Sequence, residues 1–123
     1  GPHEVIKRAT RACYGLFPKR LLMEFIWLMA ARCNIHHIYG VSDSGHVFRA
    51  LRYRLSKGRH FHASYNEFWH SIDGVADGAW RWRLPLQLER KTLESIASKK
   101  RAEYRRRFQL LDDMAAQMAI LMD

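Results

Sequence analysis

The segment from Lys19 to Cys33 constrains the fold of this chain more than any other feature. Pro18 suits the first turn of a helix, because the amide hydrogen that proline lacks would have no helical partner there. Apolar side chains then cover most of the circumference of the helix, at Leu21, Leu22, Phe25, Ile26, Leu28 and Met29. A helix that is apolar on nearly every side is stable only when other parts of the fold cover it. We therefore expect this helix to be largely buried, with Glu24 and Arg32 as its polar positions.

The length of the chain limits the number of domains. With 123 residues, 48% of them hydrophobic, the chain is long enough for one domain with its own core and too short for two ordinary ones. We predict a single domain over residues 1–123, or the C-terminal portion of a longer protein. Cys13 and Cys33 are too few for a disulfide framework, and no N-terminal stretch resembles a secretory signal. These features predict a reducing compartment, the cytoplasm, and the longest apolar run is shorter than the about 20 residues that span a bilayer.

The charge of the chain points to the kind of partner. Lys and Arg outnumber Asp and Glu by 21 to 12, which gives a net charge of +9 at neutral pH. Most of the excess lies in residues 1–63, where 11 basic side chains face 3 acidic ones. Such a protein attracts anionic partners more strongly than a neutral one does. We therefore expect an anionic partner, which the charge alone does not identify.

The rest of the chain predicts a mixed α/β fold with more helix than sheet. We expect further helices over residues 4–14, from residue 46, over 65–72 and from 98 to near the C-terminus, with strands over 35–41 and 80–84. Gly15 suits the end of the first helix, since glycine readily takes the left-handed conformation found there. Ser64 and Glu67 form a capping box before the 65–72 helix. Ser98 is expected to cap the last helix.

The residues that follow the first strand form the most site-like part of the sequence. Ser42, Asp43 and His46 stand where a strand ends in a small polar turn and leads into a helix. Such a turn exposes backbone amides, and ligands in α/β sheets bind at the carboxyl ends of strands. The alternative is a well-capped loop in which Ser42 or Ser44 caps the helix. The chain has no GxSxG nucleophile elbow, and neighbouring positions in one turn rarely give the geometry of a catalytic triad.

Several histidines raise the question of a metal site. His36 and His37 lie on opposite faces of a strand, so they cannot both reach one metal ion without distortion. His60 and His62, even together with Cys33, do not have the spacing of a zinc ribbon or a zinc finger. We therefore predict no metal site.

Two groups of aromatic residues are compatible with either packing or binding. Tyr65, Phe68 and Trp69 share one face of a helix, where they either pack in the core or shape a pocket for a base or an acyl chain. The Trp-Arg-Trp-Arg sequence at residues 80–83 alternates along a strand. Its tryptophans either belong to the core while the arginines reach water, or the set stacks on bases and holds phosphates.

A basic run near the C-terminus is unfavourably placed for helix stability. Six of the nine residues from Lys99 to Arg107 are cations, at the positive end of the helix dipole. The pair formed by Glu103 and Arg107 offsets little of this cost. Either acids from elsewhere in the fold neutralise the run, or an anion such as a phosphate, a pyrophosphate or a nucleic-acid backbone does.

Stretches spread over nearly the whole chain resemble the VirK/YbjX family of Gram-negative bacteria. They are residues 15–19 (GLFPK), 38–42 (IYGVS) followed by 46–49 (HVFR), 65–69 (YNEFW) and 98–108 (SKKRAEYRRRF). Members of the family are longer, so the chain resembles the C-terminal part of one. The resemblance implies a role in virulence, envelope remodelling and resistance to cationic antimicrobial peptides. It implies no particular reaction and assigns no catalytic residue.

The predicted order of elements is also similar to the acyl-CoA-binding half of GNAT acyltransferases. This similarity implies acyl-CoA as the cofactor, although only Gly1 and Pro2 stand where that fold has a Gly-rich loop for the pyrophosphate. We predict an acyltransferase in which Ser42 and His46 are catalytic. The residues expected to hold an anionic group of the cofactor are Lys99, Arg101, Arg105 and Arg106, and those expected to line the substrate site are Tyr65, Trp69 and Arg49.

The alternative function is a non-catalytic basic module that docks on anionic lipid or nucleic acid. Arg81, Arg83 and the basic run would then make the contact. The expected ligand is in either case a phosphate-bearing anion, such as the CoA pyrophosphate or a phospholipid headgroup, and nucleic acid is the less favoured partner. The expected location is the cytoplasm or the periphery of the inner membrane.

Overall fold

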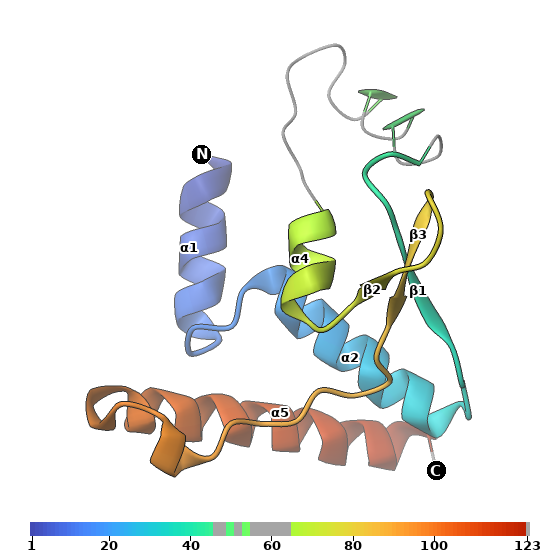
Figure 1. The fold of residues 1–123 in the computed structure, drawn as a ribbon. Coiled ribbons are helices and arrows are strands. Elements are labelled where there is room, and N and C mark those ends of the chain that lie inside the picture. The colour runs from blue at the N-terminus through green and yellow to red at the C-terminus, as the bar shows by residue number, and fades with distance from the viewer. Residues whose placement is uncertain (46–48, 51–52, 55–64, 123) are drawn as a thin grey trace. The chain divides into compact units, whose positions relative to one another are not determined.

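The computed structural model describes residues 1–45, 49–50, 53–54 and 65–122 (Figure 1). The chain divides into two compact units. Unit 1 consists of Gly1–Asn34 and Glu89–Asp123, and unit 2 consists of Ile35–Leu88. The predictions made for His46, His60, His62 and Ser64 fall outside the described residues.

Helices make up unit 1. They are α1 (Pro2–Ala12), α2 (Pro18–Arg32), the short 3-10 turns η1 (Leu93–Ser95) and η2 (Ser98–Lys100), and the long α5 (Arg101–Met122). Helix α2 packs against α5, and α1 contacts α2 (Figure 1). The buried hydrophobic residues of the unit are Leu16, Met23, Trp27, Ala30, Ile96, Leu111 and Met118. This core holds α2 on α5.

The prediction that α2 is largely buried is wrong. Its buried residues are Met23, Trp27 and Ala30, which share one side of the helix. Leu22 is 60% exposed and Phe25 is 44% exposed. The apolar pattern shows that α2 needs cover on most sides, but a pattern within one helix does not show which neighbours supply it.

Local chemistry explains some of the helix ends in unit 1. Helix α1 ends at Ala12, and Gly15 then takes a φ of 87°, which a residue without a Cβ adopts at little cost. Pro18 begins α2 as predicted. The cap predicted at Ser98 is wrong, because Ser98 lies inside η2 and the cap position before that turn is Ala97, without a side-chain hydrogen bond.

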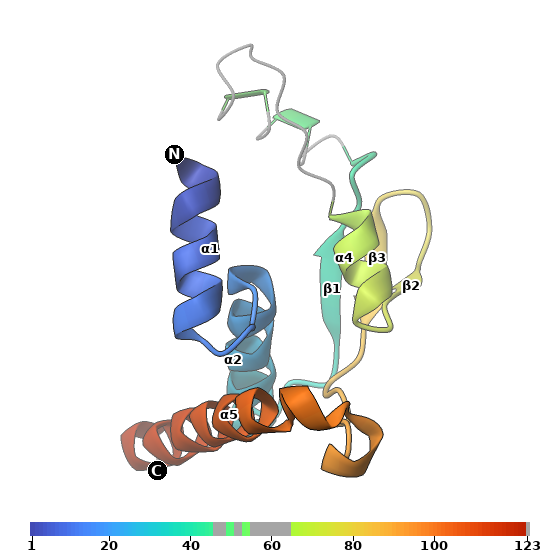
Figure 2. The same ribbon diagram turned by 90° about the vertical axis from the view of Figure 1, so that its left-hand side faces the viewer.

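Unit 2 contains a small antiparallel sheet. Its strands are β1 (Ile38–Val41), β2 (Val75–Ala76) and β3 (Arg81–Leu84), in the order β1-β3-β2. Helix α4 (Asn66–Ser71) lies on one face of this sheet (Figure 2). The mixed α/β, helix-rich fold class is thus confirmed. Strand β2 was not predicted, since two residues are too few to show an alternating pattern, and β1 starts three residues later than expected.

The direction of the strands corrects one expectation about the turn after β1. Strands β1 and β3 pair antiparallel, with Ile38 opposite Leu84 and Val41 opposite Arg81. Their carboxyl ends therefore lie at opposite ends of the sheet. The rule that ligands bind where the carboxyl ends of parallel strands meet does not apply to this turn.

Strand β3 shows the predicted alternation. Arg81 and Arg83 are exposed, Trp82 is half-buried and Leu84 is buried. Trp80, which the pattern places with the apolar side chains, is 66% exposed because it precedes the strand. The packing interpretation therefore describes Trp82 and Leu84 but not Trp80.

Candidate functional site

The hydroxyl of Ser42 is buried in the turn after β1 and hydrogen-bonded within it. The Oγ atoms of Ser42 and Ser44 are 2.9 Å apart, and Ser44 Oγ donates its proton to the carbonyl oxygen of Ala79 at 2.6 Å. Ser42 must therefore donate to Ser44, while it accepts from the Ser44 amide at 3.3 Å. The turn is tied to the segment before β3 by the Ser44 hydroxyl and by the Ser42 amide, which donates to the carbonyl oxygen of Trp80 at 2.9 Å. The predicted catalytic partner, His46, is outside the described residues.

Asp43, in the same turn, holds the start of α4. Its Oδ1 accepts from the Tyr65 amide at 2.8 Å, and its Oδ2 accepts from the Asn66 amide at 3.3 Å. Asn66 Oδ1 accepts in return from the Asp43 amide and from Nε1 of Trp82, at 3.0 and 3.2 Å. The carboxylate that satisfies the free amides of α4 thus comes from 22 residues upstream. The sequence assigned this role to the capping box at Ser64 and Glu67.

Removing this carboxylate is expected to weaken α4. We expect Asp43→Ala to lower the free energy of unfolding by about 1–2 kcal/mol, the usual cost of losing an N-terminal cap. Urea denaturation followed by circular dichroism measures the change. Glu67→Ala is the matched control, because Glu67 is exposed and a surface substitution without a special contact usually changes stability by less than about 0.5 kcal/mol. If Glu67→Ala costs more than Asp43→Ala, the capping box is the true cap.

The aromatic residues predicted to shape a pocket pack on the sheet. The Trp69 ring lies so close to Gly40 that a Cβ added there would be 2.5 Å from Cε2 of the ring. Trp69 Nε1 donates to the carbonyl oxygen of Val41 at 3.0 Å, and the ring of Tyr65 stacks on Trp69 at a centroid distance of 5.9 Å. Arg49 is exposed, and within the described ranges no contact joins it to Tyr65 or Trp69. Tyr65 and Trp69 are thus brought together against the sheet, and the joint substrate role of these two residues and Arg49 stays a prediction.

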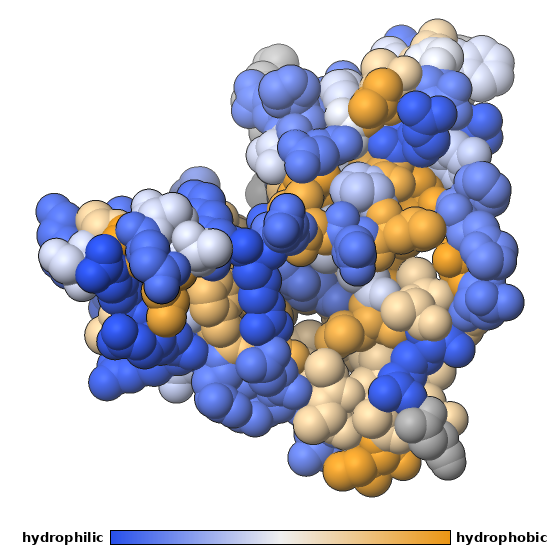
Figure 3. Space-filling model, turned by 60° about the horizontal axis from the view of Figure 1, so that its bottom comes forward, coloured by the Kyte–Doolittle hydropathy of each residue, from blue (hydrophilic) through white to orange (hydrophobic). Residues whose placement is uncertain are grey.

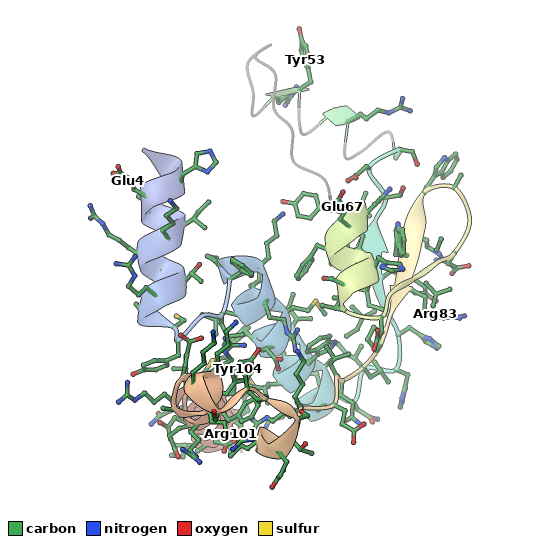
Figure 4. The ribbon with its side chains drawn as sticks, turned by 60° about the vertical axis from the view of Figure 1, so that its left-hand side comes forward. Glu4, Tyr53, Glu67, Arg83, Arg101 and Tyr104 are labelled. Carbon is green, nitrogen blue, oxygen red and sulfur yellow. The ribbon has the colours of Figure 1, made fainter. Side chains whose placement is uncertain are left out.

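Two cations of the basic run serve the fold of unit 1. Arg101, labelled in Figure 4, donates through Nε to the carbonyl oxygens of Leu93 and Ile96 at 2.9 and 3.0 Å. Arg107 donates through Nε to the carbonyl oxygen of Tyr14 at 2.9 Å, and its guanidinium lies 4.0 Å from the centre of the Tyr104 ring. The cofactor role predicted for Arg101 competes with these structural hydrogen bonds.

The other four cations of the run are exposed, and we call them the α5 basic cluster: Lys99, Lys100, Arg105 and Arg106. No acidic side chain in the described part of the chain lies within ion-pair distance of them, whereas Glu103 pairs with Arg107 and Asp112 with Arg90. Figure 3 shows hydrophilic colours over the N-terminal end of α5. The sequence left open that acidic residues of the fold neutralise the basic run. For these four cations, no acidic residue in the described part of the chain does so.

Helix α1 carries a second exposed basic surface, whose role the sequence analysis missed. Its exposed cations are Lys7, Arg8 and Arg11, none of which has an ion-pair partner among residues that the structure describes. Val5, on another side of the helix, is 64% exposed, and Ile6 is exposed beside it. A helix with one cationic side and one exposed apolar side is typical of segments that lie in a membrane interface. The alternation of charge and apolar residues along 4–11 was the signal that could have shown it.

The two exposed arginines of β3, Arg81 and Arg83, differ in the contacts of their guanidinium groups. The Arg81 guanidinium is bound to Asp77 Oδ2 at 3.1 Å and lies 4.0 Å from the centre of the Tyr39 ring. Arg83, also labelled in Figure 4, is exposed. Of the predicted contact residues on β3, Arg83 is therefore the one whose charge is open to a partner.

Over the described ranges, no three His, Cys, Asp or Glu side chains are grouped closely enough to hold a metal ion. Among the helices described, none combines the length and the apolar character needed to cross a bilayer.

Comparison with known proteins gives relatives but no activity. A family model described as "Protein of unknown function (DUF535)" matches residues 1–120. The "Uncharacterized protein YbjX" of Escherichia coli (strain K12) is 52% identical over 120 residues, which cover 98% of this chain and 36% of that protein. An "Uncharacterized protein" of Haemophilus influenzae is 37% identical over 112 residues, covering 91% of this chain and 36% of that protein. The chain thus spans about a third of the length of these relatives, and no solved structure matches it.

Proposed function

Since the chain belongs to the DUF535 family and is of the VirK/YbjX type that its sequence predicts, we propose that it docks on anionic phospholipid surfaces. The observation that carries this proposal is the α5 basic cluster, four exposed cations that no described acid neutralises. Each Lys or Arg held near an anionic bilayer contributes about 1 kcal/mol to binding. The contacting groups are the phosphates of the headgroups.

Exposed apolar residues in unit 1 favour a lipid surface over other polyanions. Tyr14 contacts Arg107 of α5, and Phe17, three residues further along the same loop, is 65% exposed. Val5 and Ile6 are exposed on α1, on the side of the helix next to its cationic side. Insertion of such side chains into the headgroup region adds apolar burial to the electrostatic attraction.

Vesicle binding at two salt concentrations tests this function. The measurement is co-sedimentation with vesicles of phosphatidylglycerol and phosphatidylcholine, compared with phosphatidylcholine alone. We expect binding only to the anionic vesicles, and we expect it to weaken strongly in high salt because exposed charges are screened. The double variant Arg105→Glu with Arg106→Glu is expected to bind at least about 100-fold more weakly, since it reverses two contacts of about 1 kcal/mol each.

A variant of equal net charge serves as the control. Arg54→Glu with Lys91→Glu changes the charge of the chain by the same amount, at exposed positions outside the cluster and outside the predicted contact on β3. We expect its vesicle affinity to fall by less than about 10-fold, through loss of net charge only. Equal loss in the two double variants would contradict a defined docking surface. Equal affinity for a DNA oligomer would favour the nucleic-acid alternative.

The acyl-CoA-dependent acyltransferase predicted from the GNAT similarity is the second proposal. Acyl-CoA is its cofactor, and Ser42 and His46 are its catalytic residues. The predicted cofactor contacts that are exposed are Lys99, Arg105 and Arg106. A gain in melting temperature with acyl-CoA that persists in high salt, and is not seen with DNA, would support it. Undiminished turnover of Ser42→Ala in a full-length protein would contradict it. A location at the inner membrane and a role in resistance to cationic peptides are compatible with the lipid proposal and stay proposals as well.

A further inference from the structure

An apolar groove lies between α2 and α5 in unit 1. Its volume is about 410 Å³, and its apolar lining includes Phe25, Met29, Leu110, Met114, Met118 and Leu121. The polar residues at the groove are Asp113 and Gln117. Figure 3 shows apolar colours gathered over the C-terminal end of α5, the end at which this groove lies. Methionine side chains are flexible and adapt to the shape of a partner, so a groove rich in them suits a packed polypeptide.

The exposed face of α2 continues the groove. Leu22, Phe25, Ile26 and Met29 are all exposed and follow the spacing i, i+3, i+4 and i+7. This spacing places them in one stripe along the helix. On α5, Leu121 is 82% exposed, and Ile120 and Met122 are exposed beside it. Contiguous exposed apolar surface of this kind marks an interaction site rather than ordinary protein surface.

We propose that this groove is filled by an amphipathic helix from the remaining part of the full-length protein. The 120 matched residues make up 36% of the E. coli relative, so about two thirds of such a protein lies outside the region described here. The stripe at helical spacing on α2 and the apolar side chains of α5 that line the groove form ridges against which a third helix packs. A covalently linked helix also binds at a high effective concentration.

A second copy of this chain is a less suitable occupant. The chain carries a net charge of +9, and two copies brought face to face repel each other. An acyl chain would fill the groove but would leave the stripe at Leu22 and Ile26 in water. The helix from the same polypeptide covers both surfaces at once.

Thiol accessibility in two forms of the protein tests the proposal. One form is the 123-residue chain, and the other is a full-length protein in which this chain replaces the matching third of the E. coli relative. Both carry Cys13→Ser and Cys33→Ser, which remove the thiols of this chain, and every cysteine in the rest of the full-length form is replaced by serine as well. Phe25→Cys then reports on the groove. Ala116→Cys is the matched control, because it is exposed on a side of α5 that faces away from the groove lining.

We expect alkylation of Phe25→Cys to be at least about 100-fold slower in the full-length form than in the 123-residue chain, as for a site that reacts only on local opening. Alkylation of Ala116→Cys should differ less than threefold between the two forms. Because Phe25→Cys removes part of the apolar contact, hydrogen exchange of α2 amides in the unsubstituted proteins gives a second measurement. Slower exchange at residues 22–29 in the full-length form is expected.

Each other outcome overturns the proposal. Protection that grows with protein concentration assigns the groove to a second copy. Protection that disappears after lipid extraction assigns it to an acyl chain. Equal alkylation and equal exchange in the two forms show that the remaining polypeptide leaves the groove open. None of these results depends on vesicle binding, so they are separate from the test of the proposed function.

Discussion

Gly40→Ala is expected to destabilise unit 2 by about 1–3 kcal/mol, the cost of forcing an extra group into a packed contact. A Cβ at this position would lie 2.5 Å from Cε2 and 2.8 Å from Cδ2 of the Trp69 ring. The ring cannot move away easily, since its Nε1 is hydrogen-bonded to the carbonyl oxygen of Val41. It also stacks with Tyr65 and contacts Phe68. The change is measured as the free energy of unfolding in urea.

A double-substitution cycle shows whether Trp69 is the cause. When Trp69→Leu has already removed the ring, Gly40→Ala should cost less than about 0.5 kcal/mol, because the two effects are coupled through one contact. A cost that stays the same in both backgrounds would mean that Gly40 is needed for a reason other than the ring. In that case Trp69 would be free to serve the pocket that the sequence predicted.

Trp27→Ala is expected to lower the free energy of unfolding of unit 1 by about 3–5 kcal/mol, as for a large aromatic side chain removed from a core. Trp27 is 5% exposed on the covered side of α2, and Arg20 lies over its ring at 5.6 Å from the centroid. Phe25→Ala, two residues away on the same helix, is the matched comparison. Because Phe25 is 44% exposed whereas Trp27 is buried, its loss should cost only about 1 kcal/mol in the 123-residue chain.

The difference in the free energy of unfolding between these two variants shows whether α2 is buried on one side or on all sides. Similar costs for Trp27→Ala and Phe25→Ala in the 123-residue chain would show that the helix is covered on both sides. In a full-length form the proposed helix covers Phe25, so there the cost of Phe25→Ala should rise by about 2 kcal/mol, toward that of a buried aromatic residue.

The stretches that carry the family resemblance meet in pairs in the structure. In unit 1, the 15–19 stretch adjoins the 98–108 stretch, since a Cβ on Gly15 would overlap Arg107 and lie 2.7 Å from Glu103 Oε1. In unit 2, the 38–42 stretch meets the 65–69 stretch at Gly40 and Trp69. The resemblance therefore follows two packing centres, and packing accounts for Gly15, Gly40 and Trp69 in these stretches.

The candidate site was only partly predictable from the sequence. The basic run was visible, because six cations at the positive end of a helix are an evident departure from helix preference. The sequence did not show that two of these cations are structural and four are exposed. Arg101 and Arg107 donate to backbone carbonyl groups of other segments. Because every residue has a backbone carbonyl group, the residue types in a sequence do not show which carbonyl accepts a hydrogen bond.

The sequence alone determined the class of fold, the helix that begins at Pro18, the alternation on β3 and the cationic character of α5. Each of these depends on neighbours within one segment, where the helix and strand periods fix which side chains share a face. The tertiary structure decided that Asp43 caps α4, that Trp69 packs on Gly40 and that one side of α2 is left open. These contacts join segments far apart in the chain, and a local pattern shows that a surface needs a partner without showing which partner meets it.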